Sequence, residues 1–160
     1  MGACKGKQNV ALIAAVLVSV LAMGGCATTY RDTGIKYSYD AKASFSERKS
    51  YAWSASSSMY RKDPLLEANV QDFADQLLAQ KGYTRSSDKP DLTISVSYEF
   101  EISSNDDIYR VRTLNLNMHK AEGRELVWRG TAFGTIRTDA ASGELKQTVQ
   151  GILSNFPPKD

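Results

Sequence analysis

Paired carboxylates and histidine are the side chains whose chemistry would support catalysis here. Glu99 and Glu101 are two residues apart, so in a β-strand both project from the same face. Most glycoside hydrolases use two catalytic carboxylates that flank the bound sugar. His119 is the only histidine, and no set of partners for a general base or a metal stands near it. We expect His119 to be a solvated strand residue, and we keep hydrolysis of envelope glycans through Glu99 and Glu101 as the alternative function.

Oxygen ligands also gather at Asp106-Asp107, flanked by Asn105 and Tyr109. Carboxylate and amide oxygens suit Ca²⁺, but the Asp-x-Asp-x-Asp-Gly spacing of calcium loops is missing. A solvated turn is therefore the expectation, with no metal and no cofactor. Tryptophan side chains can stack on sugars, but Trp53 and Trp128 both lie in apolar strand sequences. We therefore expect both to be buried in the core.

Short hydroxyl and amide side chains recur at alternate positions of three predicted strands, which would place them on one flat face. Such a face can hydrogen-bond a glycan or another protein, although an ordinary hydrated sheet surface has the same pattern. The candidate binding face consists of Ser95, Ser97, Asn115, Asn117 and Thr131, and Thr93 and Thr135 extend it.

The N-terminus has the three regions of a signal peptide. Lys5 and Lys7 precede an apolar run from Val10 to Met23, and the small pair Gly24-Gly25 follows just before Cys26. The segment from Leu21 to Cys26 resembles the bacterial lipobox, in which the cysteine becomes the lipidated first residue of the mature protein. The resemblance implies cleavage before Cys26 and acylation, palmitate included, of that cysteine.

Three other interpretations of this end are weaker. The apolar run is about 14 residues long, where a membrane span needs about 20. N-myristoylation at Gly2 would require Ser or Thr where Gly6 stands. An ordinary secretory peptide with an incidental cysteine remains the third.

Removal of residues 1–25 leaves 135 residues, the size of one domain. Cys4 leaves with the signal peptide and Cys26 is used by the lipid, so no thiol remains for a disulfide or a metal. The mature chain has 18 basic and 18 acidic residues, because Lys5 and Lys7 are lost from the total of 20 basic residues. This balance argues against a nucleic-acid partner.

Hydrophobic spacing predicts two helices and about five strands. One helix begins with Asp63-Pro64 and ends at Gly82, and the other ends at Pro157-Pro158. Their apolar stripes are Leu66, Val70, Phe73, Leu77 and then Leu145, Val149, Ile152, Phe156. The strands are expected at 35–39, 51–53, 92–102, 114–118 and 126–135, the third with strict apolar–polar alternation. Gly130 suggests a bulge or close approach, which leaves the face of Phe133 open.

These elements predict an α+β domain over residues 35–160, with both helices packed on one face of an antiparallel sheet. Residues 26–34 form a short polar tether between the lipid and the domain. The predicted shared core consists of Leu66, Val70, Phe73, Leu77, Val96, Tyr98, Trp128, Val149 and Ile152.

Several short motifs in order resemble the bacterial lipoprotein family called domain of unknown function 4136. They are Tyr51-Ala52-Trp53, Asp63-Pro64-Leu65-Leu66, Lys81-Gly82-Tyr83, Pro90-Asp91-Leu92, the run from Leu126 to Ala132 and Phe156-Pro157-Pro158. The resemblance implies an envelope lipoprotein and brings no catalytic residue with it. We therefore expect a non-enzymatic binding or structural protein, anchored by lipid, with an envelope protein or a glycan as its partner.

The first testable expectation is that Cys26 carries the lipid. Replacing Cys26 with Ser should abolish labelling of the protein by a fatty-acid analogue in growing cells and should block cleavage of the signal peptide. Labelling that persists in the variant would show that the acyl chain is attached elsewhere.

Localisation gives a second expectation, namely the periplasmic face of the outer membrane. In many Gram-negative species an Asp after the lipidated cysteine retains a lipoprotein in the inner membrane, and here Ala27 stands there. The tether from Ala27 to Gly34 reaches no more than about 30 Å, which keeps the domain close to its membrane. Changing Ala27 to Asp should move the protein to the inner-membrane fraction of a density gradient with its lipidation intact. Wild-type protein in that fraction would contradict the assignment.

Overall fold

The computed structural model describes residues 33–55, 62–101, 110–139 and 143–158. They belong to one compact unit that spans Arg31–Asp160. The order of elements is β1 (Gly34–Tyr39), β2 (Ser50–Trp53), α2 (Pro64–Gln80), β3 (Thr84–Arg85), β4 (Leu92–Phe100), β5 (Arg110–Lys120), β6 (Leu126–Arg137) and α3 (Glu144–Ser154). The α+β class is confirmed.

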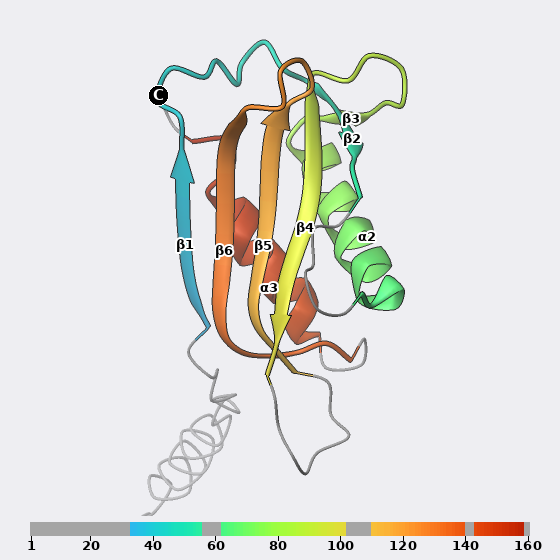
Figure 1. Cartoon of the computed structure of the whole chain (residues 1–160), viewed down its shortest axis with the longest axis vertical. Coiled ribbons are helices and arrows are strands. Elements are labelled where there is room, and N and C mark those ends of the chain that lie inside the picture. Colours follow the sequence, from blue (N-terminus) through green and yellow to red (C-terminus); the bar gives the residue numbers. More distant parts are fainter. Residues whose placement is uncertain (1–32, 56–61, 102–109, 140–142, 159–160) are drawn as a thin grey trace, which may run out of the picture. The chain divides into compact units, whose positions relative to one another are not determined.

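The strands form one six-stranded sheet in the order β1-β6-β5-β4-β2-β3 (Figure 1). Strands β4, β5, β6 and β1 are antiparallel neighbours, as expected. Strand β2, however, runs parallel to both β3 and β4. The prediction of a purely antiparallel sheet of about five strands was therefore wrong in two respects, its strand directions and the omission of β3.

The parallel pairing follows from the helix that separates β2 from β4 in the chain. A helix laid across a sheet carries the chain back to the end where the previous strand began, so the next strand runs in the same direction. Helix α2 makes this return. Strand β3 could not be predicted from the sequence, because two residues are too few to show the apolar–polar alternation of a strand.

Helix α2 begins where the sequence predicted. The Asp63 side chain accepts hydrogen bonds from the backbone N–H groups of Leu65 and Leu66, and Pro64 occupies the first turn. The helix ends at Gln80, and Gly82 follows with a φ of +81°, which a residue with a side chain rarely adopts.

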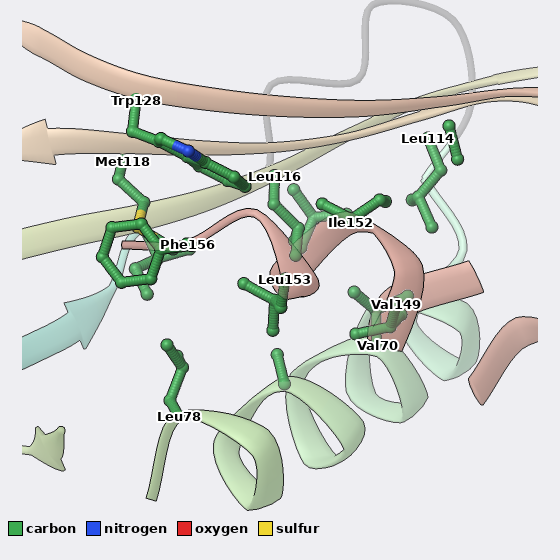
Figure 2. Packing of buried hydrophobic residues seen from close by; sticks show 14 of the residues in the cluster. Val70, Leu78, Leu114, Leu116, Met118, Trp128, Val149, Ile152, Leu153 and Phe156 are labelled. Carbon is green, nitrogen blue, oxygen red and sulfur yellow. The ribbon is translucent and has the colours of Figure 1, made fainter. Parts of the chain in front are cut away.

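Both helices pack on the same face of the sheet and enclose the core (Figures 1 and 2). Trp128 and Ile152 are fully buried, and Gly130 allows them to meet because a Cβ there would collide with both side chains. Phe156, just past the end of α3, contacts the rings of Phe45, Tyr83 and Trp128. Gly130 is thus a point of close approach, one of the two roles expected of it.

The buried stripe of α2 is shifted from the predicted one. Leu66, Val70, Ala74 and Leu78 are buried, whereas Phe73 and Leu77 are only partly buried against the edge of the core. The buried positions therefore repeat every four residues, and α3 packs against the same helix. The other predicted core residues are buried: Val96, Tyr98, Trp128, Val149 and Ile152.

Among the described residues, no helix is both long enough and apolar enough to cross a bilayer.

Two leucines of α2 offer a matched test of this packing. Leu78→Ala should lower the free energy of unfolding by about 2–5 kcal/mol, because Leu78 is fully buried. Leu65→Ala, on the same helix but 72% exposed, should change it by less than about 0.5 kcal/mol. Urea denaturation followed by circular dichroism measures both, and equal effects of the two substitutions would contradict the packing described.

Candidate functional site

The sheet face opposite the helices is the candidate site, and we call it the open face (Figure 1). In the described part of the chain no helix lies on this face. The register brings the predicted side chains together in rows that cross three strands. Ser95 pairs with Asn117, which pairs with Arg129, and Ser97 pairs with Asn115, which pairs with Thr131. The predicted candidate binding face is therefore contiguous in space.

Hydrogen bonds link the side chains of these rows across the strands. The Arg129 Nε–H donates to Asn117 Oδ1 at 2.6 Å, and Asn117 Nδ2 donates to Ser97 Oγ at 3.3 Å. The Thr131 hydroxyl donates to Asn115 Oδ1 at 2.7 Å. These bonds hold the side chains of β4, β5 and β6 in fixed orientations, which a merely hydrated surface would not require.

Burial also distinguishes the open face from an ordinary hydrated surface. Asn117 is only 5% exposed and Ser95 only 7%, although they lie on the uncovered side of the sheet. Thr93 and Thr135, the outer members of the predicted set, are partly buried. The centre of the open face is therefore a packed polar layer, while Arg129 beside it is exposed.

Phe133, whose orientation the sequence left undecided, lies on the open face and is 40% exposed. Its ring covers Gly34 of β1, where a Cβ would collide with it. The Lys36 ammonium lies 5.0 Å from the ring centroid, a cation–π contact. These contacts join the edge strand β1 to β6 on this face.

His119 also lies on the open face, opposite Thr93 of β4. Burial lowers the pKa of its imidazole, and the nearby positive charge of Arg129 lowers that pKa further, against a hydrogen bond with the Thr93 backbone that raises it. The side chain is therefore more often neutral at pH 7 than a free histidine. Its neighbours here are Thr93 and Arg129.

Glu99 and Glu101 of the alternative function are both exposed, Glu99 at the far end of β4 and Glu101 just beyond it. In the register Glu99 faces Thr113, which pairs with Phe133. Glu99 is therefore two rows away from the Asn117–Arg129 pair.

Some sequence predictions cannot be compared with the structure. Cys26, together with Asn105, Asp106, Asp107 and Tyr109, lies outside the described residues. Within the described residues, no group of three or more histidine, cysteine, aspartate or glutamate side chains is arranged to hold a metal ion.

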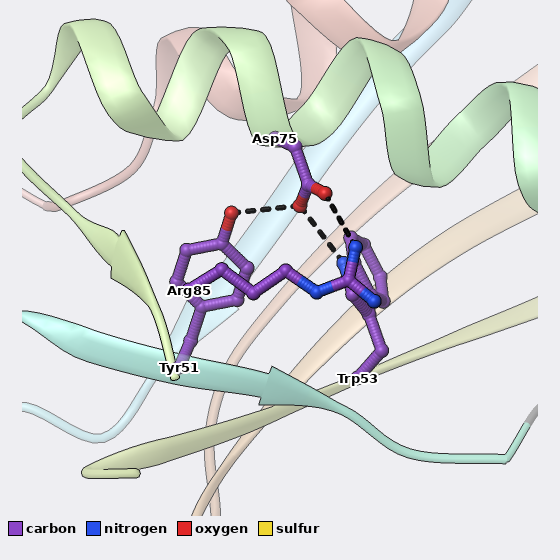
Figure 3. Close-up of polar contacts among 4 residues, drawn as sticks. All are labelled: Tyr51, Trp53, Asp75 and Arg85. Carbon is purple, nitrogen blue, oxygen red and sulfur yellow. Dashed lines mark hydrogen bonds and ion pairs between the residues drawn. The ribbon is translucent and has the colours of Figure 1, made fainter. Parts of the chain in front are cut away.

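A polar cluster around Asp75 was missed by the sequence analysis (Figure 3). Asp75 Oδ1 accepts hydrogen bonds from the Tyr51 hydroxyl at 2.7 Å and the Trp53 indole N–H at 2.8 Å. Asp75 Oδ2 forms an ion pair with Arg85 at 3.0 Å. One carboxylate of α2 thus holds β2 and β3. Trp53, expected in the core, is only partly buried because its N–H reaches this carboxylate, whereas Trp128 is fully buried as expected.

A second polar contact fixes the start of α2 to β4. The Tyr98 hydroxyl donates to Glu67 at 2.8 Å and accepts from the Asp63 backbone N–H at 2.6 Å. Burial and the Glu67 carboxylate raise the pKa of Tyr98 to about 12, against the opposing effect of the Asp63 N–H. The hydroxyl therefore stays protonated and can keep donating. Both clusters are on the helix side of the sheet and serve to position α2.

Comparison with known proteins identifies a family and several similar folds. The profile of a family described as a domain of unknown function (DUF4136) matches residues 35–158. A DUF4136 family protein from Bacteroides thetaiotaomicron has the same fold, with 14% identity, a TM-score of 0.51, and coverage of 79% of this chain and 95% of that one. Among curated proteins, none matches the sequence significantly.

Two further solved structures share the fold. The PelC dodecamer from Paraburkholderia phytofirmans has 16% identity and a TM-score of 0.56, with 80% of this chain and 100% of that chain covered. A PDZ domain protein from Parabacteroides distasonis has 14% identity and a TM-score of 0.61, with 80% of this chain covered. The match spans only 36% of the latter protein's length.

The Asp75 cluster predicts a specific effect on stability. Asp75→Ala leaves the Tyr51 hydroxyl and the Trp53 N–H without their acceptor, and should lower the free energy of unfolding by about 1–3 kcal/mol. Asp75→Asn keeps an acceptor oxygen and should lower the free energy of unfolding by less than Asp75→Ala does. Asp72→Ala, at an exposed position of the same helix, should change it by less than about 0.5 kcal/mol. Urea denaturation measures all three, and an Asp75→Ala effect no larger than that of Asp72→Ala would contradict the anchoring role.

Proposed function

The chain belongs to the DUF4136 family, and from this membership we propose that it is a lipid-anchored envelope protein with a non-enzymatic binding or structural role. Its lipid is on Cys26, and its place is the periplasmic face of the outer membrane. The signal layout before Cys26 and the absence of Asp at position 27 support this location. The open face is the part of the domain that meets the partner.

The observation that carries the proposal is the packed polar layer at the centre of the open face. Side chains that already hydrogen-bond one another lose little conformational freedom when a ligand arrives, so binding costs less entropy. The fold of PelC, which assembles into a dodecamer, supports the idea that a domain of this architecture serves as a structural component.

Exposed aromatic residues on the two sides of the same sheet provide the test. We expect the photo-crosslinking residue p-benzoylphenylalanine at position 133, on the open face, to form adducts in intact cells, visible as shifted bands on a gel. The same residue at Tyr37, 51% exposed on the opposite side of β1, is the matched control and should form few adducts. Equal adducts at both positions, or none at position 133, would contradict the proposal.

The same experiment separates binding from hydrolysis. Replacing Glu99 and Glu101 together with Ala should leave the adducts at position 133 unchanged, because in this proposal neither carboxylate has a catalytic role. A folded, lipidated double variant that accumulates more glycan adducts at position 133 than the wild type would favour the hydrolase instead.

A further inference from the structure

Arg129 is an exposed cation held in a fixed direction near the middle of the open face. Its Nε–H can only donate, so the oxygen of the Asn117 amide must face it, and the Asn117 NH₂ group must face Ser97. Asn117 itself is almost fully buried. The base of the guanidinium is thus anchored, while the Arg129 side chain as a whole is exposed to solvent.

In the described part of the chain, no acidic side chain forms an ion pair with Arg129. The ion pairs of the described residues join Arg85 to Asp75, Lys120 to Glu125 and Arg137 to Asp139, and none of them includes Arg129. Glu99, on the same face, is four positions along the strands and two strands across. That separation is roughly 13 Å by 9 Å, longer than the screening distance of about 8 Å at physiological salt.

The internal hydrogen bonds of the open face use the oxygen of each of its two amide side chains as an acceptor. Asn117 Oδ1 is used by Arg129, and Asn115 Oδ1 is used by Thr131. Among the described residues, no hydrogen bond uses the terminal guanidinium N–H groups of Arg129 or the NH₂ group of Asn115, so these donors can serve a ligand. Burial lowers the pKa of the neighbouring His119, and the positive charge of Arg129 lowers that pKa further. A surface rich in donors and positive charge selects a ligand rich in acceptors and negative charge.

We propose that the open face around Arg129 binds an acidic glycan, with a sugar carboxylate or phosphate on the guanidinium and sugar hydroxyls on Asn115 and Thr131. This inference rests on the proposed function and names its ligand class. A glycan fits better than an acidic protein because protein interfaces centre on buried aromatic anchors. Phe133, an exposed aromatic residue of this face, is two rows from the Asn117–Arg129 pair. Its ring already contacts Gly34 and the Lys36 ammonium.

The test compares one polymer with and without its charge. Full-length lipidated protein in phosphatidylcholine nanodiscs is titrated with oligogalacturonate and with its methyl ester, and binding is followed by calorimetry. We expect oligogalacturonate to bind at least tenfold more tightly than the ester, and Arg129→Gln to remove that difference. Arg129→Lys should keep part of it, because it retains the charge but not the planar fork. Arg137→Gln, at an exposed arginine of the same strand that pairs with Asp139, should bind like the wild type.

A phosphorylated mannan oligosaccharide, titrated beside its dephosphorylated form, distinguishes phosphate from carboxylate as the preferred anion. Equal binding of the acid and the ester together with equal binding of the two mannans, or wild-type binding by Arg129→Gln, would overturn the inference. Polyglutamate that binds as tightly as either charged glycan would overturn it in favour of an acidic protein. If the inference fails while position 133 still forms its adducts in cells, the proposed function stands and only the ligand class is wrong.

Discussion

The structure depends on the fact that α2 and α3, the two helices of the described residues, cover only one face of the sheet. Alternation of apolar and polar residues along β4, β5 and β6 sends most large apolar side chains of these strands toward α2 and α3, with Phe133 as an exception on the open face. The opposite side of the same strands must then be polar. Since these side chains stand side by side across three strands, they satisfy one another, and Asn117 becomes the bridge between Ser97 and Arg129. The core and the open face are two consequences of one pattern.

Periodicity let the sequence predict the parts of the fold that are long and regular. The alternation from Leu92 onward placed Ser95 and Ser97 on one face correctly, and the Asp63-Pro64 pair located the start of α2. Strand direction was missed because periodicity carries no information about which strands become neighbours. The strand–helix–strand order around α2 did contain that information, since such a connection favours parallel pairing.

Residues whose role depends on distant partners could not be assigned from the sequence. Asp75 has the appearance of a solvent-exposed helix residue, and its function as the acceptor for Tyr51 and Trp53 appears only when β2 is placed beneath α2. Phe73 satisfied the helical spacing, but the fully buried residue is its neighbour Ala74. Arg129 was absent from the predicted binding face because a charged residue in a run of strand residues resembles any other exposed charge.

The polar contacts on the helix side have a consequence for the open face. The helix side of the sheet supplies contacts that do not depend on the side chains of the open face. Asp75 holds β2 and β3, and Tyr98 holds β4 to the first turn of α2, while Phe156 closes the core near Trp128 of β6. The strands that carry Ser97, Asn117 and Arg129 are therefore fixed by contacts that no ligand on the open face would disturb. A site built on strands held in this way keeps its donor geometry whether or not it is occupied, which is the condition for recognising a ligand by the direction of its hydrogen bonds.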